Sequence, residues 1–169
     1  EFTITPQVAC VPFNTTTVNL TTTANTCNVT YNWTVLFNGS TCLPSAGTFN
    51  FIGGTNASSF QPQFQFVDPG QYTVRLTVTN SCGSFIYYQP VTAQAPPQVS
   101  INPVPAICEG QSVSPSAPII ECYDTPTTFN WTFAGSGAPN SNQQTPGAVT
   151  YNNDGNFTIT FSATNACGT

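Results

Sequence analysis

Apolar and polar residues alternate along several stretches of the chain with a period of two. In residues 72–79, Tyr, Val, Leu and Val alternate with Thr, Arg, Thr and Thr. Such a period places each set of side chains on its own face of a β-strand, so the stretch predicts a strand with one buried and one solvated face. The same alternation occurs in residues 31–37, 129–133 and 157–164. No stretch shows the period of an amphipathic helix, and 15 prolines and 12 glycines disfavour long helices, so the sequence predicts an all-β chain.

One of these strands occurs twice. Residues 72–83, YTVRLTVTNSCG, return as residues 157–168, FTITFSATNACG, 85 positions later. The copies also share a cysteine and a tryptophan farther upstream, in pairs 98 positions apart: Cys10 and Cys108, Trp33 and Trp131. The difference, 98 − 85 = 13 residues, indicates an insertion in the first copy, for which residues 40–60 are the obvious place.

The repeat predicts two tandem domains, residues 1–94 and residues 95–169. Residues 83–94, GSFIYYQPVTAQ, read as the closing strand of the first copy, and the APPQ segment that follows is a short, stiff linker. The second copy shows no counterpart of this closing strand. We therefore expect the second domain to lack its last strand, to present an open sheet edge, and to belong to a longer repeat array.

The chain carries very little charge. Charged residues make up 4% of it, with one cation, Arg75, and six acids, for a net charge of −5. Nucleic acids and anionic membrane surfaces are not expected partners, because binding them requires several Lys or Arg side chains. No apolar run approaches 18 residues, so no membrane insertion of this segment is expected. Seven cysteines without a CxxC or Cys/His spacing indicate disulfides in an oxidising compartment, and hence an extracellular protein.

No arrangement of residues predicts a catalytic site. The chain contains no His, so a Cys or Ser nucleophile lacks its usual general base. The six acids read as turn-forming Asp and solvated Glu. Glu121 and Asp124, on either side of Cys122, are a weak candidate for a calcium site, and no other cofactor or metal is expected.

Three aromatic residues stand outside the alternating pattern. Phe49, Phe51 and Phe60 lie in the insertion, among Gly, Ser and Asn residues. Two interpretations are open. Packing over an extra hairpin is the favoured one, and an exposed contact surface is the other.

The patterns above resemble a known family. A strand Trp followed by DPGQYTV, residues 68–74, resembles an immunoglobulin-like sandwich with a tyrosine corner. The fuller pattern, Trp and then GxYTVxLTVTN, resembles the polycystic kidney disease (PKD) domain. The resemblance implies two tandem antiparallel β-sandwiches. It also implies a core built around four aromatic residues: Trp33, Trp131, Tyr72 and Phe157. The usual WDFGDG after the Trp is absent, so the carboxylates linked with cation binding there are missing, and Phe157 cannot make the hydroxyl hydrogen bond of a tyrosine corner.

The CEGQSV segment and the TNSCG and TNACG endings resemble more particularly the PKD-like repeats of giant Bacteroidetes cell-surface adhesins, including SprB-like gliding-motility adhesins. This resemblance implies a structural segment of a secreted adhesin, extending a fibre for adhesion or gliding. Neighbouring repeats of the same long chain, and surface polysaccharide, are the expected partners. The alternative is a polysaccharide-binding accessory module of a secreted enzyme.

The resemblance also implies a disulfide scheme. In an immunoglobulin-like sandwich, the loop before the Trp strand and the loop after the tyrosine-corner strand lie at one end, which pairs Cys27 with Cys82 and Cys122 with Cys167. Cys10 and Cys42 fall at the opposite end and are expected to pair. Cys108 is then left over, because seven cysteines cannot all pair within the chain.

Overall fold

The chain forms two compact β-rich units. The computed structural model describes residues 1–22 and 28–169, which divide into Glu1–Ala95 and Pro96–Thr169. This boundary follows residue 95, whereas the sequence places it after residue 94. The described residues form strands, turns and loops without a helix, which confirms the all-β prediction. None of them therefore belongs to a helix long and apolar enough to span a membrane.

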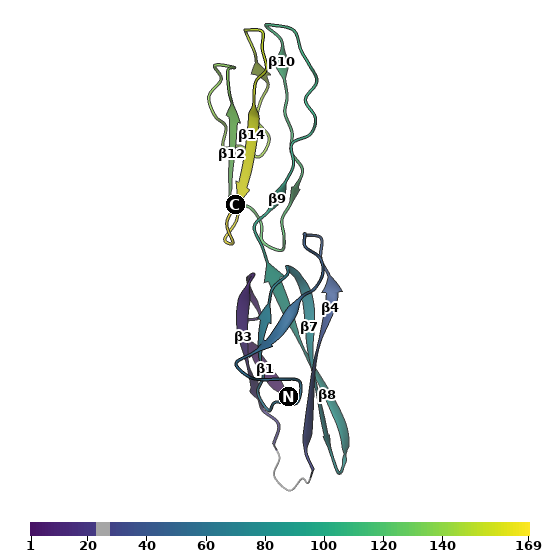
Figure 1. Cartoon of the computed structure of the whole chain (residues 1–169). Coiled ribbons are helices and arrows are strands. Elements are labelled where there is room, and N and C mark those ends of the chain that lie inside the picture. Colours follow the sequence, from purple (N-terminus) through teal and green to yellow (C-terminus); the bar gives the residue numbers. More distant parts are fainter. Residues whose placement is uncertain (23–27) are drawn as a thin grey trace. The chain divides into compact units, whose positions relative to one another are not determined.

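Two four-stranded sheets make up the first unit (Figure 1). Its strands are β1 (Phe2–Thr5), β2 (Val8–Cys10), β3 (Phe13–Asn19), β4 (Thr30–Gly39), β5 (Phe49–Ile52), β6 (Gln63–Phe66), β7 (Gly70–Asn80) and β8 (Gly83–Gln94). One sheet has the order β1-β3-β6-β5 and the other has the order β2-β8-β7-β4. Neighbouring strands are antiparallel, except that β2 runs parallel to β8.

The core of the first unit draws on both sheets, as the alternating pattern predicts. Along β7, Tyr72 is 1% exposed and the apolar residues that alternate with the Thr positions are equally buried. Trp33 of β4 lies opposite Leu76 and contacts the ring of Phe2 edge-on, with 4.7 Å between ring centroids. Its indole N–H donates a hydrogen bond of 2.9 Å to the Ser59 carbonyl, so the ring is satisfied within the core.

A tyrosine corner forms at the start of β7. The buried Tyr72 hydroxyl donates a hydrogen bond of 2.7 Å to the main-chain carbonyl of Asp68, four residues upstream. The Asp68 carboxylate accepts the Thr48 N–H at 2.9 Å, which fastens the loop before β5 to the same corner. Gly70 has a φ of 155°, and a Cβ there would lie 2.5 Å from the Phe37 ring, so only glycine fits this position.

The insertion supplies a strand of the first sheet. Residues 49–52 form β5, which pairs with β6, and Phe49 and Phe51 pack against the core. Phe60 is 46% exposed, although its ring contacts Tyr31 edge-on. The packing interpretation is therefore confirmed for Phe49 and Phe51, and Phe60 keeps an exposed surface.

The second unit contains six shorter strands among the described residues, arranged in three pairs. The strands are β9 (Gln98–Val99), β10 (Ser112–Val113), β11 (Ile119–Ile120), β12 (Thr128–Phe133), β13 (Val149–Thr150) and β14 (Ile159–Thr164). The pairs are β9 with β11, β10 with β13, and β12 with β14. Trp131 is fully buried and stacks on Phe161, with 4.3 Å between ring centroids. Trp131 lies opposite Phe161 on the paired strand, just as Trp33 lies opposite Leu76 in the first unit.

The prediction that Phe157 lies in the core is wrong. Phe157 is 37% exposed, and β14 begins two residues after it. In the first unit the equivalent Tyr72 lies opposite Val91 of β8, and the described residues of the second unit supply no strand in that place. Phe157 instead stacks on Tyr151 with 4.9 Å between ring centroids.

Candidate functional site

Of the six cysteines that the structure describes, four are disulfide-bonded and two are free. The bonded ones are Cys10, Cys42, Cys122 and Cys167. Each belongs to a pair predicted from the sequence, Cys10–Cys42 or Cys122–Cys167, and the pairing itself stays a prediction. Cys82 and Cys108 are exposed free thiols. Cys27 lies outside the described residues, and so does its predicted disulfide with Cys82.

Hydrogen bonds join the loop that carries Cys122 to the loop that carries Cys167. Asp124 accepts two of them: its carbonyl takes the Asn165 side-chain amide at 3.1 Å, and its carboxylate takes the Ala166 N–H at 2.9 Å. Glu121 accepts the Thr125 hydroxyl at 3.4 Å. The Asp124 carboxylate therefore joins the two loops, whereas the Glu121 carboxylate bonds within its own loop. Among the described residues, no group of three or more His, Cys, Asp or Glu side chains could hold a metal ion.

The TNxCG motif forms the same turn in both units. The side-chain carbonyl of Asn80 accepts the Cys82 N–H at 2.8 Å, and that of Asn165 accepts the Cys167 N–H at 2.8 Å. The hydroxyls on either side of each turn also meet, at 2.8 Å between Thr79 and Ser84 and at 2.6 Å between Thr164 and Thr169. Asn suits this position because its short side chain bonds to the main chain two residues onward. The repeated motif is thus a hairpin turn and not a ligand site.

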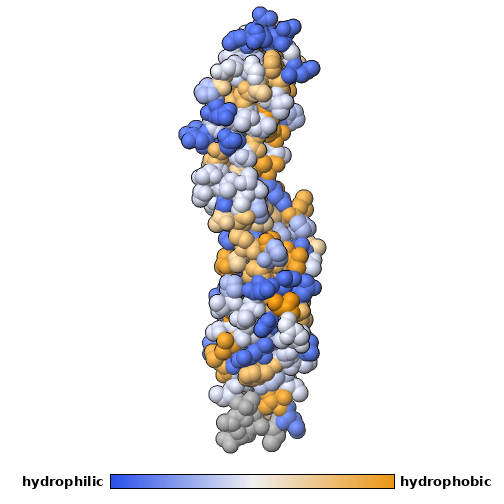
Figure 2. Space-filling view, turned by 60° about the vertical axis from the view of Figure 1, so that its left-hand side comes forward, coloured by the Kyte–Doolittle hydropathy of each residue, from blue (hydrophilic) through white to orange (hydrophobic). Residues whose placement is uncertain are grey.

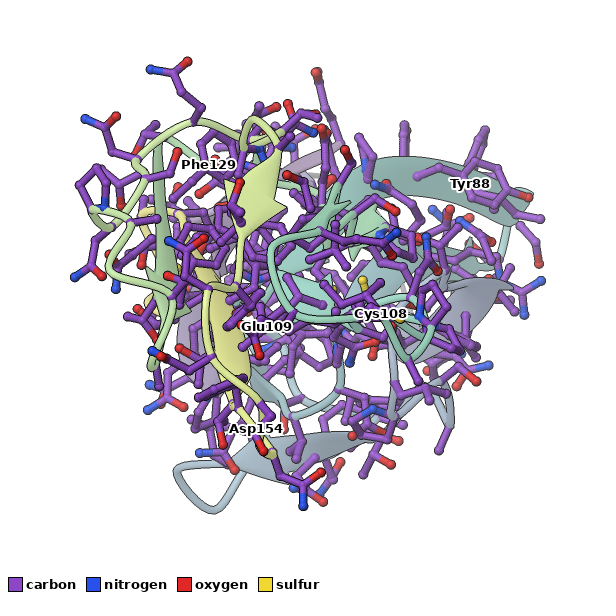
Figure 3. The ribbon with its side chains drawn as sticks, turned by 90° about the horizontal axis from the view of Figure 1, so that it is seen from above. Tyr88, Cys108, Glu109, Phe129 and Asp154 are labelled. Atoms are coloured by element: carbon purple, nitrogen blue, oxygen red, sulfur yellow. The ribbon has the colours of Figure 1, made fainter. Side chains whose placement is uncertain are left out.

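An exposed sheet edge lies along the first half of β8. β2 pairs only with Thr92–Gln94, so residues 83–88 hydrogen-bond to β7 alone among the described strands. Four large side chains on this edge are exposed: Phe85 (50%), Ile86 (50%), Tyr87 (36%) and Tyr88 (56%). Tyr88 lies at the periphery of the molecule in Figure 3. Elsewhere, hydrophobic residues are interspersed among hydrophilic ones on the face in Figure 2. We call residues 85–88 the aromatic edge.

A groove of about 660 Å³ lies in the second unit. One side is formed by residues 104–109 and the other by residues 153–157. The Cys108 thiol and the carboxylates of Glu109 and Asp154 are its charged or reactive groups, all three exposed (Figure 3). No imidazole or amine is present to act as a base, because the chain contains neither His nor Lys beside them.

Tyr151 lies in the wall of this groove, and no sequence pattern points to it. Its side chain is 6% exposed and its hydroxyl is buried without a hydrogen-bond partner. Burial raises the pKa of the Tyr151 phenol above its ordinary value of 10.0. The equivalent position in the first unit is Phe66, so this hydroxyl has no structural counterpart there.

The two regions offer binding surfaces and no reaction centre. The aromatic edge presents apolar side chains on a strand that pairs with β7 alone among the described strands, and the groove presents apolar walls with two carboxylates at their margin. The sequence predicted the strand that forms the aromatic edge but missed its exposure, and it predicted an open sheet edge in the second domain without indicating the residues that line the groove.

Comparison with known proteins identifies one family. The PKD domain profile matches residues 1–85, which is the first unit up to the beginning of β8. No curated protein sequence matches the chain.

Proposed function

Since this chain belongs to the PKD domain family, a family of non-catalytic immunoglobulin-like modules that are typically extracellular, we propose that it is a structural repeat segment of a long, secreted cell-surface adhesin. In this role its two units act as spacers in a fibre that serves adhesion or gliding. Neighbouring repeats of the same long chain are its main partners. The chain itself carries no enzymatic activity.

The observation that carries this proposal is the reuse of one structural unit. Both units bury a strand Trp whose indole N–H donates to a downstream carbonyl, Ser59 in one case and Gln144 in the other. In both units the strand that pairs with the Trp strand ends in the same Asn-based turn. Repetition of a buried scaffold is typical of structural modules.

The surface composition and the disulfides support the extracellular location. The chain has only one Lys or Arg among 169 residues, which leaves trypsin-like proteases almost no site to cleave. Disulfides persist in oxidising environments such as the cell exterior, and four cysteines are bonded here. The resemblance to repeats of Bacteroidetes gliding-motility adhesins supports the cell surface as the final location.

In-frame deletion of this segment from the gene that encodes the protein tests the proposal. The shortened protein should still be exported, because the segment acts as a spacer, and the cells should attach to surfaces less efficiently. The matched control replaces the segment with a two-domain spacer of unrelated sequence, which should restore attachment. Failure of that replacement, with export intact, would show that the segment has a specific binding role.

A second candidate is a polysaccharide-binding accessory module, and the aromatic edge favours it. Exposed Tyr rings such as Tyr87 and Tyr88 provide flat apolar faces, which sugar rings commonly stack on. A pull-down with insoluble polysaccharides, comparing the unaltered chain with Tyr87→Ala/Tyr88→Ala, distinguishes the candidates. Binding lost in the double variant supports the accessory module, and no binding by either chain supports the structural segment.

A further inference from the structure

Arg75 is the one Lys or Arg residue of the chain, and it lies on the outer face of a sheet. In β7 it stands opposite Thr34 of β4 on one side and opposite Tyr88 of β8 on the other. Val74 and Leu76, its neighbours along β7, are buried in the core. Because successive side chains of a strand point to opposite faces, the Arg75 side chain lies on the face that is directed away from the core.

The surroundings of Arg75 on this outer face are uncharged. The neighbouring rows across the three strands are Asn32, Thr77 and Ile86 on one side, and Leu36, Thr73 and Pro90 on the other. The apolar members of the face, Leu36, Ile86 and Tyr88, are exposed. The face therefore combines a single cation with exposed apolar side chains and with hydroxyl and amide groups.

The acidic residues of the first unit do not neutralise Arg75. They are Glu1 and Asp68. Asp68 is 6% exposed and accepts a main-chain N–H in the tyrosine corner, while Glu1 lines a groove with Val78, on the core side of the sheet. Within the described part of the chain, Arg75 forms no ion pair. In a chain with a net charge of −5, an unpaired cation on a face without carboxylates favours an anionic partner.

Thr34 holds the Arg75 guanidinium in place. The Nε–H of Arg75 donates a hydrogen bond of 2.9 Å to the Thr34 hydroxyl oxygen. This is the one side-chain hydrogen bond that Arg75 makes with described residues, so both terminal nitrogens keep their N–H donors for a ligand. Two such nitrogens in one plane match the two oxygens of a carboxylate.

The second unit shows that the fold does not require an arginine here. At the offset of 85 positions the equivalent of Arg75 is Thr160, and at the offset of 98 positions the equivalent of Thr34 is Thr132. These two Thr residues lie opposite each other, and their hydroxyls share a hydrogen bond. Since Thr satisfies the same sheet position, pairing and packing of the sheet do not account for Arg75.

The position of Arg75 favours a saccharide over a peptide as the anionic partner. An extended peptide binds a sheet through main-chain hydrogen bonds at a free edge. β7 is a central strand, paired with β4 and β8 on its two sides, so its main chain is already bonded beside Arg75. A ligand of this face therefore contacts side chains, which suits a sugar with an apolar ring face and a rim of hydroxyls.

We propose that the outer face around Arg75 binds an acidic polysaccharide. One uronate residue places its carboxylate on Arg75 and the apolar face of its ring against Tyr88. Side chains opposite each other on neighbouring strands have Cβ atoms about 5 Å apart, so a single sugar residue reaches both. Thr73, Thr77 and Asn32 supply hydroxyl and amide groups for the sugar hydroxyls. This inference rests on the polysaccharide-binding candidate above and names the class of polysaccharide.

Isothermal titration calorimetry of the full 169-residue chain with tetragalacturonate tests the site. Two further ligands serve as controls: the methyl ester of tetragalacturonate, which keeps the rings and removes the charge, and the neutral cellotetraose. We expect saturable binding of tetragalacturonate. Both controls should bind at least about tenfold more weakly, because they lack the charge-assisted hydrogen bonds to Arg75.

Variants of the chain assign the binding to this face. Arg75→Thr introduces the residue of the second unit and should weaken binding of tetragalacturonate at least about tenfold, with Trp33 fluorescence confirming that the first unit is folded. Arg75→Lys keeps the charge without the planar pair of donors, so its affinity should fall between those of the unaltered chain and Arg75→Thr. Tyr88→Ala should also weaken binding, because it removes the ring that the sugar stacks on.

The proposal is overturned if tetragalacturonate does not bind at millimolar concentration, if its methyl ester binds equally well, or if a folded Arg75→Thr chain binds as tightly as the unaltered one. Equal binding of tetraglutamate would also overturn it, since the partner would then be an acidic peptide. Binding of cellotetraose without a preference for tetragalacturonate would refute this inference and leave the polysaccharide-binding candidate standing, whereas binding of no sugar would count against both.

Discussion

Removing the Tyr72 hydroxyl should destabilise the first unit by about 2 kcal/mol. In Tyr72→Phe the ring stays in place while the 2.7 Å hydrogen bond to the Asp68 carbonyl is lost. A neutral hydrogen bond contributes about 1 kcal/mol net, and a buried acceptor left without a partner costs about 1–3 kcal/mol, which gives a combined estimate of about 2 kcal/mol. For a unit of 95 residues this lowers the melting temperature by roughly 10 °C.

Tryptophan fluorescence measures this change in one unit at a time. The chain has two Trp residues, and Trp33 and Trp131 are buried in different units. Urea unfolding in a Trp131→Phe background therefore reports the first unit through Trp33. Unchanged slopes with a shifted midpoint would show that stability, and not the unfolded state, has changed.

Tyr88→Phe is the matched control for Tyr72→Phe. It removes the same atom from a residue that is 56% exposed, where water satisfies the hydroxyl in both states. We expect its free energy of unfolding to stay within about 0.5 kcal/mol of that of the unaltered chain. If Tyr72→Phe behaves like Tyr88→Phe, the tyrosine corner does not stabilise this unit and the reasoning is refuted.

Three further predictions follow from the cysteines and from Tyr151. Peptide mapping without reduction should recover two linked peptides, Cys10–Cys42 and Cys122–Cys167, and a peptide linking the two units would contradict this scheme. Maleimide labelling of the native chain should modify Cys82 and Cys108, and Cys82→Ser or Cys108→Ser should each lower the number of labelled thiols by one. If Cys82 resists labelling, that result would favour its predicted bond to Cys27. Because burial raises the pKa of Tyr151, the unfolded state loses its proton first as the pH rises. The contribution of the protonated Tyr151 phenol to the stability of the second unit should therefore be present below pH 10 and be lost as the pH rises above it. Urea unfolding followed through Trp131 fluorescence measures this change. Tyr151→Phe should remove that part of the pH dependence, and an identical profile in both chains would contradict the assignment.

Alternation predicted β4, β7 and β12, and it predicted β14 except at its beginning. Residues 72–79 form the middle of β7, because β4 and β8 both pair with them and the period of two matches the buried and solvated faces. Residues 157–158 have the same pattern and lie outside β14. The alternating pattern gives a segment's preference for the extended conformation. Whether the segment forms a strand also depends on a neighbouring strand that lies elsewhere in the sequence.

The residues that line the groove and the exposure of the aromatic edge depend on which strands pair, and residue types do not give that pairing; the repeat predicted only an open sheet edge in the second domain. The groove is lined by residues 104–109 and 153–157, which lie more than 40 positions apart in the sequence. The aromatic edge is exposed because β2 covers only three residues of β8. Tyr151 was missed for a related reason, since the two-residue strand β13 before it gives no period to recognise.

Antibody labelling of intact cells tests the central claim, that this chain is an extracellular structural segment, most directly. Antibodies against the first unit are applied to cells that produce the protein, before and after permeabilisation, and after shaving with a protease of broad specificity. If the claim is right, labelling of intact cells equals that of permeabilised cells, and shaving removes it. Labelling that appears only after permeabilisation and survives shaving would contradict the claim.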